Sequence, residues 1–164
     1  MSKFEIKMAK IIVDKFVDKI WAGHSISQNN IKKIVNECLR CVGIVANKTF
    51  VNISFVDDTT MIEYNKKFYG KDCITNVLSF ENENKFIGND LYLGEIVLCY
   101  SKIAEEAEKF KKSFNDRLWH LFVHGTLHTL GYDHINEDER HEMEILEAKV
   151  LKTFGISNIY EILC

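Results

Sequence analysis

His124-Gly125-Thr126-Leu127-His128-Thr129-Leu130-Gly131-Tyr132-Asp133-His134 is a histidine-rich run in the last third of the chain. Residues four apart on an α-helix lie about 40° apart on one face, with about 6 Å of rise, so His124 and His128 can direct ring nitrogens at one point. Gly131 can take positive φ without a Cβ penalty and end the helix, which lets the chain turn and return His134. The run therefore predicts a three-histidine metal site, a set that suits Zn²⁺ and leaves a fourth position for water.

The helix that carries these histidines is expected over about residues 115–130 and is apolar on most of its sides. Its large apolar residues are Leu118, Trp119, Leu121, Phe122, Val123, Leu127 and Leu130. A helix apolar nearly all round is buried, and buried imidazoles need partners. A hydrogen-bonded core cluster is the alternative to a metal site, and the spacing with its glycine break favours the metal. His120, one turn before His124, is a fourth ligand, a hydrogen-bonding partner of a ligand, or neither.

Length and composition predict one domain over residues 1–164. Hydrophobic residues make up 46% and charged residues 27% of the chain, as in soluble globular proteins. No apolar run approaches the roughly 20 residues that span a bilayer, and residues 1–7 do not resemble a signal peptide, so the prediction is a cytoplasmic protein without membrane contact. The formal net charge of −3 provides no global basic field, so any RNA contact must come from local patches. Five cysteines at irregular spacing argue against a disulfide framework.

The hydrophobic periodicity predicts a mixture of helices and strands. Helices are expected over residues 9–21, 31–42, 60–69, 101–110, 115–130 and 136–154, and strands over 49–56, 74–80 and 91–100, with a further short strand over 4–8. Thr60 with Glu63, and Asn136 with Glu139, form capping boxes at two helix starts, and Ser101 caps a third. The resulting fold class is α+β, a small mixed β-sheet packed with about five helices, with a zincin-like three-histidine metal site.

The spacing H-x-x-x-H-x-x-G-x-x-H is shared with the metzincin metalloproteases. Those enzymes place a Glu directly after the first His as the general base. The corresponding residue here is Gly125, which has no side chain to accept a proton. A peptidase of that type is therefore disfavoured, although a metal here can still activate water and polarise a carbonyl or phosphoryl oxygen.

With its neighbours included, the run His124-Gly125-x-Leu127-His128-x-x-Gly131-Tyr132-Asp133-His134 resembles the YbeY family of single-strand-specific metallo-endoribonucleases of rRNA maturation. Two upstream segments are also similar, Gly70-Lys71-Asp72-x-x-Thr75-Asn76-Val77-Leu78-Ser79-Phe80 and Leu93-Gly94-Glu95-Ile96-Val97. The family usually has Asp in place of Glu95. Together these segments extend the resemblance over about residues 52–154.

The resemblance implies a zinc-dependent hydrolase of RNA phosphodiesters, with one Zn²⁺ per chain held by His124, His128 and His134. It implies single-stranded rRNA as substrate and the ribosome or small-subunit precursors as partners. The implied roles are processing of the 16S rRNA 3′ end and ribosome quality control. Two alternatives remain: a ribosome-assembly RNA-binding factor whose zinc is structural, with His120 as an extra ligand, and a zinc hydrolase of another substrate such as a peptide or an ester.

Candidate substrate contacts lie just before the Gly-Lys-Asp segment. The family usually has Arg where this chain has Tyr69, so a planar cation suited to bidentate phosphate contact is missing. Lys67 and Lys71, together with Lys66, surround Phe68 and Tyr69. This cluster can hold a phosphate backbone and stack a base, or it is simply a solvated helix end.

The sequence does not identify the general base for the expected water attack. Arg117 falls on the histidine face of the helix, where it binds phosphate or pairs with an acid, and Lys71 is a further catalytic candidate. Asp133 is expected to orient a ligand imidazole through its other ring nitrogen. Glu95 is a candidate for either the base or the orienting role. The sequence does not predict an oligomeric state.

Overall fold

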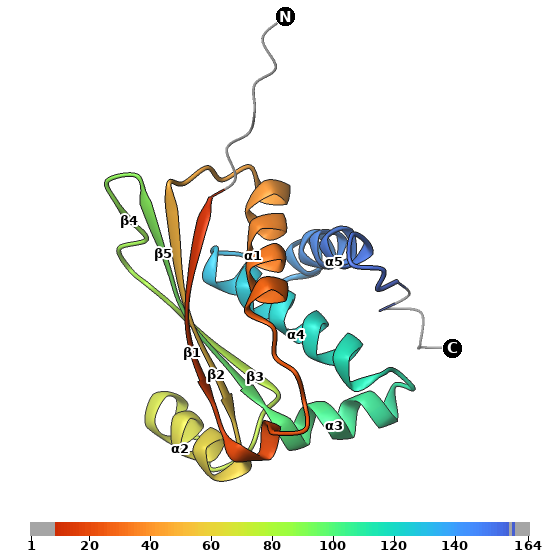
Figure 1. Cartoon of the computed structure of the whole chain (residues 1–164). Helices are drawn as coiled ribbons and strands as arrows, with labels where there is room; N and C mark the ends of the chain where they lie inside the picture. The colour runs from red at the N-terminus through yellow and green to blue at the C-terminus, as the bar shows by residue number, and fades with distance from the viewer. Residues whose placement is uncertain (1–8, 158, 160–164) are drawn as a thin grey trace, which may run out of the picture.

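The computed structural model describes residues 9–157 and 159 and has a mixed five-stranded sheet at its centre (Figure 1). The strand order is β1 (Lys10–Val17), β2 (Lys48–Val56), β5 (Asp90–Cys99) and β3 (Val77–Glu81), and β4 (Phe86–Ile87) also pairs with β5. The pairs β1–β2 and β2–β5 are parallel, whereas β3 and β4 run antiparallel to β5.

Helices cover the two faces of this sheet unequally. They are α1 (Gln28–Val42), α2 (Asp58–Tyr69), α3 (Tyr100–Lys109), α4 (Phe114–Thr129) and α5 (Glu137–Lys152), with a short 3₁₀ helix, η1 (Lys19–Trp21). Figure 1 shows α1, α3, α4 and α5 on one side of the sheet and α2 alone on the other. The architecture confirms the predicted α+β class with a mixed sheet and five α-helices.

The histidine helix α4 lies in the larger helical layer and packs closely on the sheet at Gly125. A Cβ atom added at Gly125 would lie 3.0 Å from both Ile96 Cγ2 and Ser79 Oγ. The Ser79 hydroxyl donates a hydrogen bond to the Gly125 carbonyl at 3.2 Å. A side chain at this position would press on both of these residues, so glycine lets α4 pack closely beside β3 and β5.

The predicted helix over residues 9–21 is wrong. Residues 10–17 form β1, which pairs in parallel register with β2, and residues 19–21 form η1. The segment is rich in Ile, Val and Phe, which favour strands, and a free edge of β2 offers it a ladder of backbone hydrogen bonds. Trp21 is fully buried and donates from Nε1 to the Val56 carbonyl at 3.1 Å. The possible strand over residues 4–8 lies outside the described residues.

Helix starts differ from the prediction in two places. The cap of α2 is Asp57, whose carboxylate accepts from the Thr60 N–H at 2.9 Å, so the box of Thr60 with Glu63 is wrong. Helix α3 begins at Tyr100, one residue before the predicted cap Ser101. The capping box at the start of α5 is confirmed, with Asn136 and Glu139 bonding each other's backbone N–H.

Among the described residues, none of the helices combines the length and apolar character needed to cross a bilayer. The four described cysteines are free thiols, as the sequence predicts. Cys38 and Cys99 are buried, whereas Cys73 is exposed.

Candidate metal centre

The three predicted histidines converge at the C-terminal end of α4. One ring nitrogen from each of His124, His128 and His134 lies within 4.8 Å of the others. The Nε2 atoms of His124 and His128 are 3.0 Å apart. Two nitrogens bound to one tetrahedral zinc ion are separated by about 3.3 Å, so the rings are already close to the spacing that a metal requires. His134 arrives there because the chain turns at Gly131, which has a φ of +97°.

A buried carboxylate on α5 orients the first of these histidines. Glu147 is only 1% exposed, and its Oε1 lies 2.5 Å from Nδ1 of His124. Its other oxygen lies 2.9 Å from Nε2 of His120. A proton on Nδ1 of His124, donated to Glu147, leaves the Nε2 lone pair directed at the site, which is the tautomer that binds a metal.

Electrostatics at the site favour an ionised Glu147 carboxylate and a neutral His128 imidazole. Burial alone would raise the pKa of Glu147, but the hydrogen bonds from His120 and His124 outweigh it and lower the pKa. Burial lowers the pKa of His128, and the neighbouring rings of His124 and His134 lower it further. A neutral imidazole is the form that coordinates a metal, so these effects favour the ligating state of His128.

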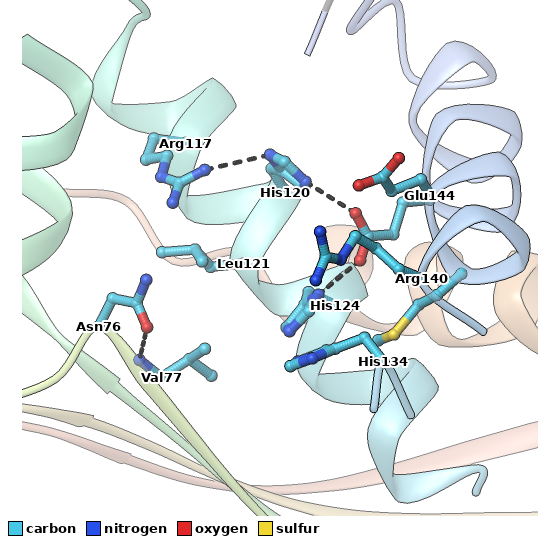
Figure 2. A pocket seen from close by; sticks show the side chains of 11 residues that line it. Asn76, Val77, Arg117, His120, Leu121, His124, His134, Arg140 and Glu144 are labelled. Atoms are coloured by element: carbon cyan, nitrogen blue, oxygen red, sulfur yellow. Dashed lines mark hydrogen bonds and ion pairs between the residues drawn. The ribbon is translucent and has the colours of Figure 1, made fainter. Parts of the chain in front are cut away.

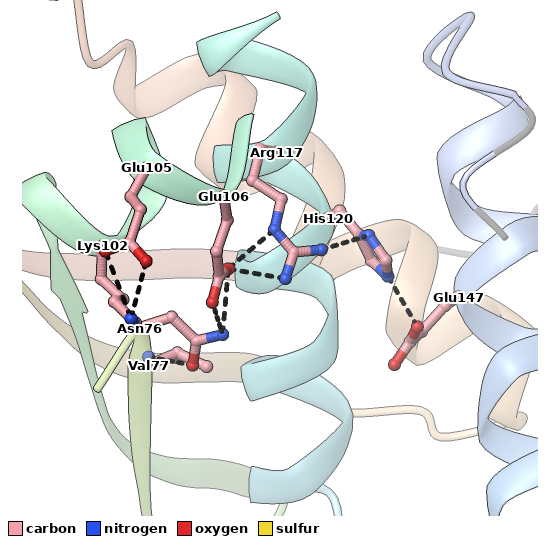
Figure 3. Close-up of polar contacts among 8 residues, drawn as sticks. All are labelled: Asn76, Val77, Lys102, Glu105, Glu106, Arg117, His120 and Glu147. Carbon is pink, nitrogen blue, oxygen red and sulfur yellow. Dashed lines mark hydrogen bonds and ion pairs between the residues drawn. The ribbon is translucent and has the colours of Figure 1, made fainter. Parts of the chain in front are cut away.

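A series of polar contacts runs from Asn76, at the start of β3, to Glu147 on α5 (Figure 3), and Glu147 in turn contacts His124. Arg117 donates to Glu106 through Nε at 3.0 Å and through a terminal nitrogen at 2.7 Å. Its other terminal nitrogen lies 3.3 Å from Nδ1 of His120, whose Nε2 faces Glu147. At the far end the side-chain amide of Asn76 donates to Glu106 at 3.1 Å. These polar contacts therefore link β3, α3, α4 and α5 around the triad.

Two cavities flank the triad and share Asn76, Val77, His124 and His134 in their walls. The first, of about 320 Å³, lies toward α5; its lining also includes Arg117, His120, Leu121, Arg140, Met143, Glu144 and Glu147 (Figure 2). The second, of about 460 Å³, lies toward β3; its lining also includes Tyr69, Leu78, Ser79, Glu81, His128, Gly131, Tyr132 and Asp133. The histidines are thus reached from two sides by space large enough for parts of a polymeric substrate.

Comparison with known proteins gives the family to which a chain with this site belongs. A family model described as "Endoribonuclease YbeY" matches residues 17–155. The chain belongs to the YbeY endoribonuclease family. Among its relatives, Endoribonuclease YbeY of Francisella tularensis (strain FSC 198) is 40% identical over 132 residues, and the match covers 74% of this chain and 78% of the relative. Endoribonuclease YbeY of Rhizobium etli is 43% identical over 115 residues, and the match covers 68% of this chain and 66% of the relative.

A solved structure extends the likeness in fold. The solution structure of TM1509 from Thermotoga maritima has a TM-score of 0.57 and 23% identity, and the match covers 88% of this chain and 92% of that one. The fold of this chain is therefore shared with that protein.

The sequence also singled out other residues near the triad, which the structure now places. His120 faces Glu147 and Arg117 and is not part of the cluster of three convergent ligand atoms. Arg117 is paired with Glu106, one of its two expected alternatives, and lines the cavity on the α5 side. The carboxylate of Asp133 accepts from the backbone N–H of His134 at 2.8 Å, so it fixes the backbone of a ligand and not an imidazole ring.

The remaining candidates from the sequence are Glu95, Tyr69, Lys67 and Lys71. Glu95 accepts hydrogen bonds from the hydroxyls of Ser54 and Tyr64, on the sheet face that carries α2, which leaves it badly placed to act as a base or to orient a ligand. Tyr69 is half exposed and lines the cavity on the β3 side. Lys67 lies over the Phe68 ring, and neither it nor the exposed Lys71 lines a cavity beside the triad.

Two residues of this YbeY site were missed in the sequence, Glu147 and Arg140. Glu147 interrupts an apolar stripe of α5 that contains Met143, Leu146 and Val150. A carboxylate at a core position of an amphipathic helix needs a buried partner, and that is the signal which was available. Arg140 lies among charged neighbours in the first turns of α5, where its position gives no comparable signal.

Proposed function

We propose that the protein is a zinc-dependent, single-strand-specific endoribonuclease that acts in the cytoplasm on rRNA in ribosomes or small-subunit precursors. Its proposed roles are processing of the 16S rRNA 3′ end and ribosome quality control. The observation that carries this proposal is the set of three convergent imidazoles in a chain of the YbeY endoribonuclease family.

The donor set supports zinc as the metal. Three neutral imidazoles are typical ligands of catalytic zinc, which keeps a further position for water or substrate. In this proposal His124, His128 and His134 hold the ion, and Glu147 fixes the ring of His124. An ion held there supplies Lewis-acid chemistry, which activates water and stabilises charge on a phosphoryl oxygen.

The surroundings of the triad support a catalytic site more than a closed structural one. A structural zinc usually has four protein ligands, and His120 was the expected fourth. His120 instead faces Glu147 and Arg117. Cavities on both sides of the triad give RNA a path past the metal. Gly125 supports a mechanism without a glutamate base in that position, because a side chain there would crowd Ser79 on β3 and Ile96 on β5.

Cleavage of a labelled single-stranded RNA by the purified protein tests the proposal. We expect cleavage by the zinc-loaded protein, its loss with a chelator, its return with added zinc, and its loss in His128→Ala. His141→Ala is the matched control, because His141 is exposed on α5. Cleavage that persists unchanged in His128→Ala would exclude the metal from the mechanism. Retained RNA binding with no cleavage at any zinc concentration would favour the assembly-factor alternative.

A further inference from the structure

We infer that the cavity on the α5 side of the triad is a binding subsite for an RNA phosphate group and that Arg140 is its anion-binding residue. The inference rests on the proposed function, because it assigns one part of the substrate to one side of the histidines.

Arg140 is positioned at the edge of the site by a well-fixed helix start. Its backbone N–H donates to the Asn136 carbonyl at 3.0 Å, and the capping box of Asn136 with Glu139 holds the same turn. The side chain is exposed and lines the same cavity as His124 and His134. Figure 2 shows its guanidinium extending from α5 toward α4 and ending beside His124.

Arg140 also differs from the other cations beside the two cavities, because no ion-pair partner for it lies among the described residues. Arg117, the other guanidinium in the cavity wall, forms a partly buried ion pair with Glu106 at 2.7 Å. Lys85, which approaches Gly131 at the rim of the other cavity, pairs with Glu81 at 2.6 Å. Within residues 9–157 no carboxylate lies at ion-pair distance from Arg140, although Glu144 lines the same cavity.

The two cavities therefore differ in the charged residues of their walls and in how well each can bind a phosphate group. The wall toward β3 contains no Lys or Arg among the described residues and carries Glu81 and Asp133, both acidic. The wall toward α5 also has two carboxylates, Glu144 and Glu147, of which Glu147 faces His120 and His124. It differs from the other wall in carrying the guanidinium of Arg140, which has no ion-pair partner among the described residues and whose planar fork can bind two phosphate oxygens at once. A phosphate of the RNA backbone next to the cleaved bond is thus favoured on the α5 side.

The test compares Arg140→Gln with Arg40→Gln in the zinc-loaded protein. Arg40 lies on α1, outside both cavities, so the control removes the same charge elsewhere. For Arg140→Gln we expect KM for single-stranded RNA to rise about tenfold, the size of one lost charge-assisted contact. The dependence of log Kd on log salt should fall by about 0.7, as for one phosphate contact to a single strand. Arg140→Lys should restore part of the affinity.

A second readout separates this inference from the proposed function. Binding of inorganic phosphate to the zinc-loaded protein, measured by calorimetry, requires no RNA cleavage; we expect it to weaken in Arg140→Gln and not in Arg40→Gln. Equal RNA KM and equal phosphate affinity in the two variants would overturn the role of Arg140. Absence of RNA cleavage by the wild type would instead overturn the proposed function, while the phosphate measurement would still decide the subsite.

Discussion

Glu147 and His124 meet across the interface between α4 and α5, with Oε1 of Glu147 2.5 Å from Nδ1 of His124. The carboxylate is almost completely buried, and its other oxygen lies within hydrogen-bond distance of Nε2 of His120. Each of its two oxygens therefore has an imidazole as partner. A buried charge is tolerated only with such partners. The contact therefore joins the packing of α5 to the orientation of a metal ligand.

Replacing Glu147 by Gln should weaken zinc binding with little change in shape. The substitution removes the charge that favours the Nδ1-protonated tautomer of His124, and loss of such an orienting partner typically costs about 10-fold to 100-fold in metal affinity. Competition with a chromophoric chelator measures the zinc Kd. Glu144→Gln is the control, since Glu144 lies one turn away on α5 and has no hydrogen bond to a described ligand ring. Equal zinc affinity in the two variants would show that Glu147 serves packing alone.

Gly125→Ala should destabilise the fold through the contact between α4 and the sheet. The new methyl group would meet Ile96 Cγ2 and Ser79 Oγ at 3.0 Å, and overpacking of this kind costs about 1–3 kcal/mol. Urea unfolding of the two proteins measures the difference in free energy. Gly23→Ala is the matched control, because a Cβ atom there has no neighbour within 4 Å. A Gly125→Ala protein as stable as the wild type would mean that α4 can move away from β3 without cost.

The part of the site that the sequence predicts is the part encoded locally. His124 and His128 are one helical turn apart and Gly131 marks the end of the helix, so these residues predict the convergence that the structure has. Glu147 could not be placed in the same way. Its contact with His124 depends on how α5 folds back onto α4, and that geometry is set by tertiary packing.

The error over residues 9–21 has a related cause. The apolar residues of this segment fit a helical spacing as well as a strand, so periodicity alone does not decide between the two. The decision comes from β2, whose edge pairs with residues 10–17 in parallel. A parallel partner separated by the whole of α1 cannot be recognised from local sequence.

Asp57→Ala should destabilise α2 in a manner that depends on pH. The Asp57 carboxylate caps the helix, and the Thr60 N–H that it accepts lowers its pKa. Loss of a cap costs about 1 kcal/mol. This contribution is present at pH 7, above the unfolded pKa of about 3.9, and is lost as the pH falls through the lower folded pKa. Urea unfolding from pH 7 to pH 3 should show the gap between wild type and Asp57→Ala closing in acid.

Two further variants control this experiment. Asp57→Asn retains an uncharged cap, so its stability relative to Asp57→Ala should persist in acid. Thr59→Ala changes an exposed residue of the same turn and should match the wild type closely. A gap between wild type and Asp57→Ala that stays constant down to pH 3 would mean that the carboxylate charge makes no contribution to the cap.

Tyr69→Arg should raise RNA affinity or turnover. Tyr69 lines the cavity on the β3 side of the triad, and the centroid of its half-exposed ring lies 6.1 Å from that of Phe80. No described Lys or Arg contributes to the wall of this cavity. A guanidinium there would add a bidentate phosphate contact, worth about tenfold in KM. Steady-state cleavage of single-stranded RNA measures the change, with Ile87→Arg as control because Ile87 is an exposed residue outside both cavities. A gain equal to that of Ile87→Arg would reflect net charge alone, and no gain would place Tyr69 off the RNA path.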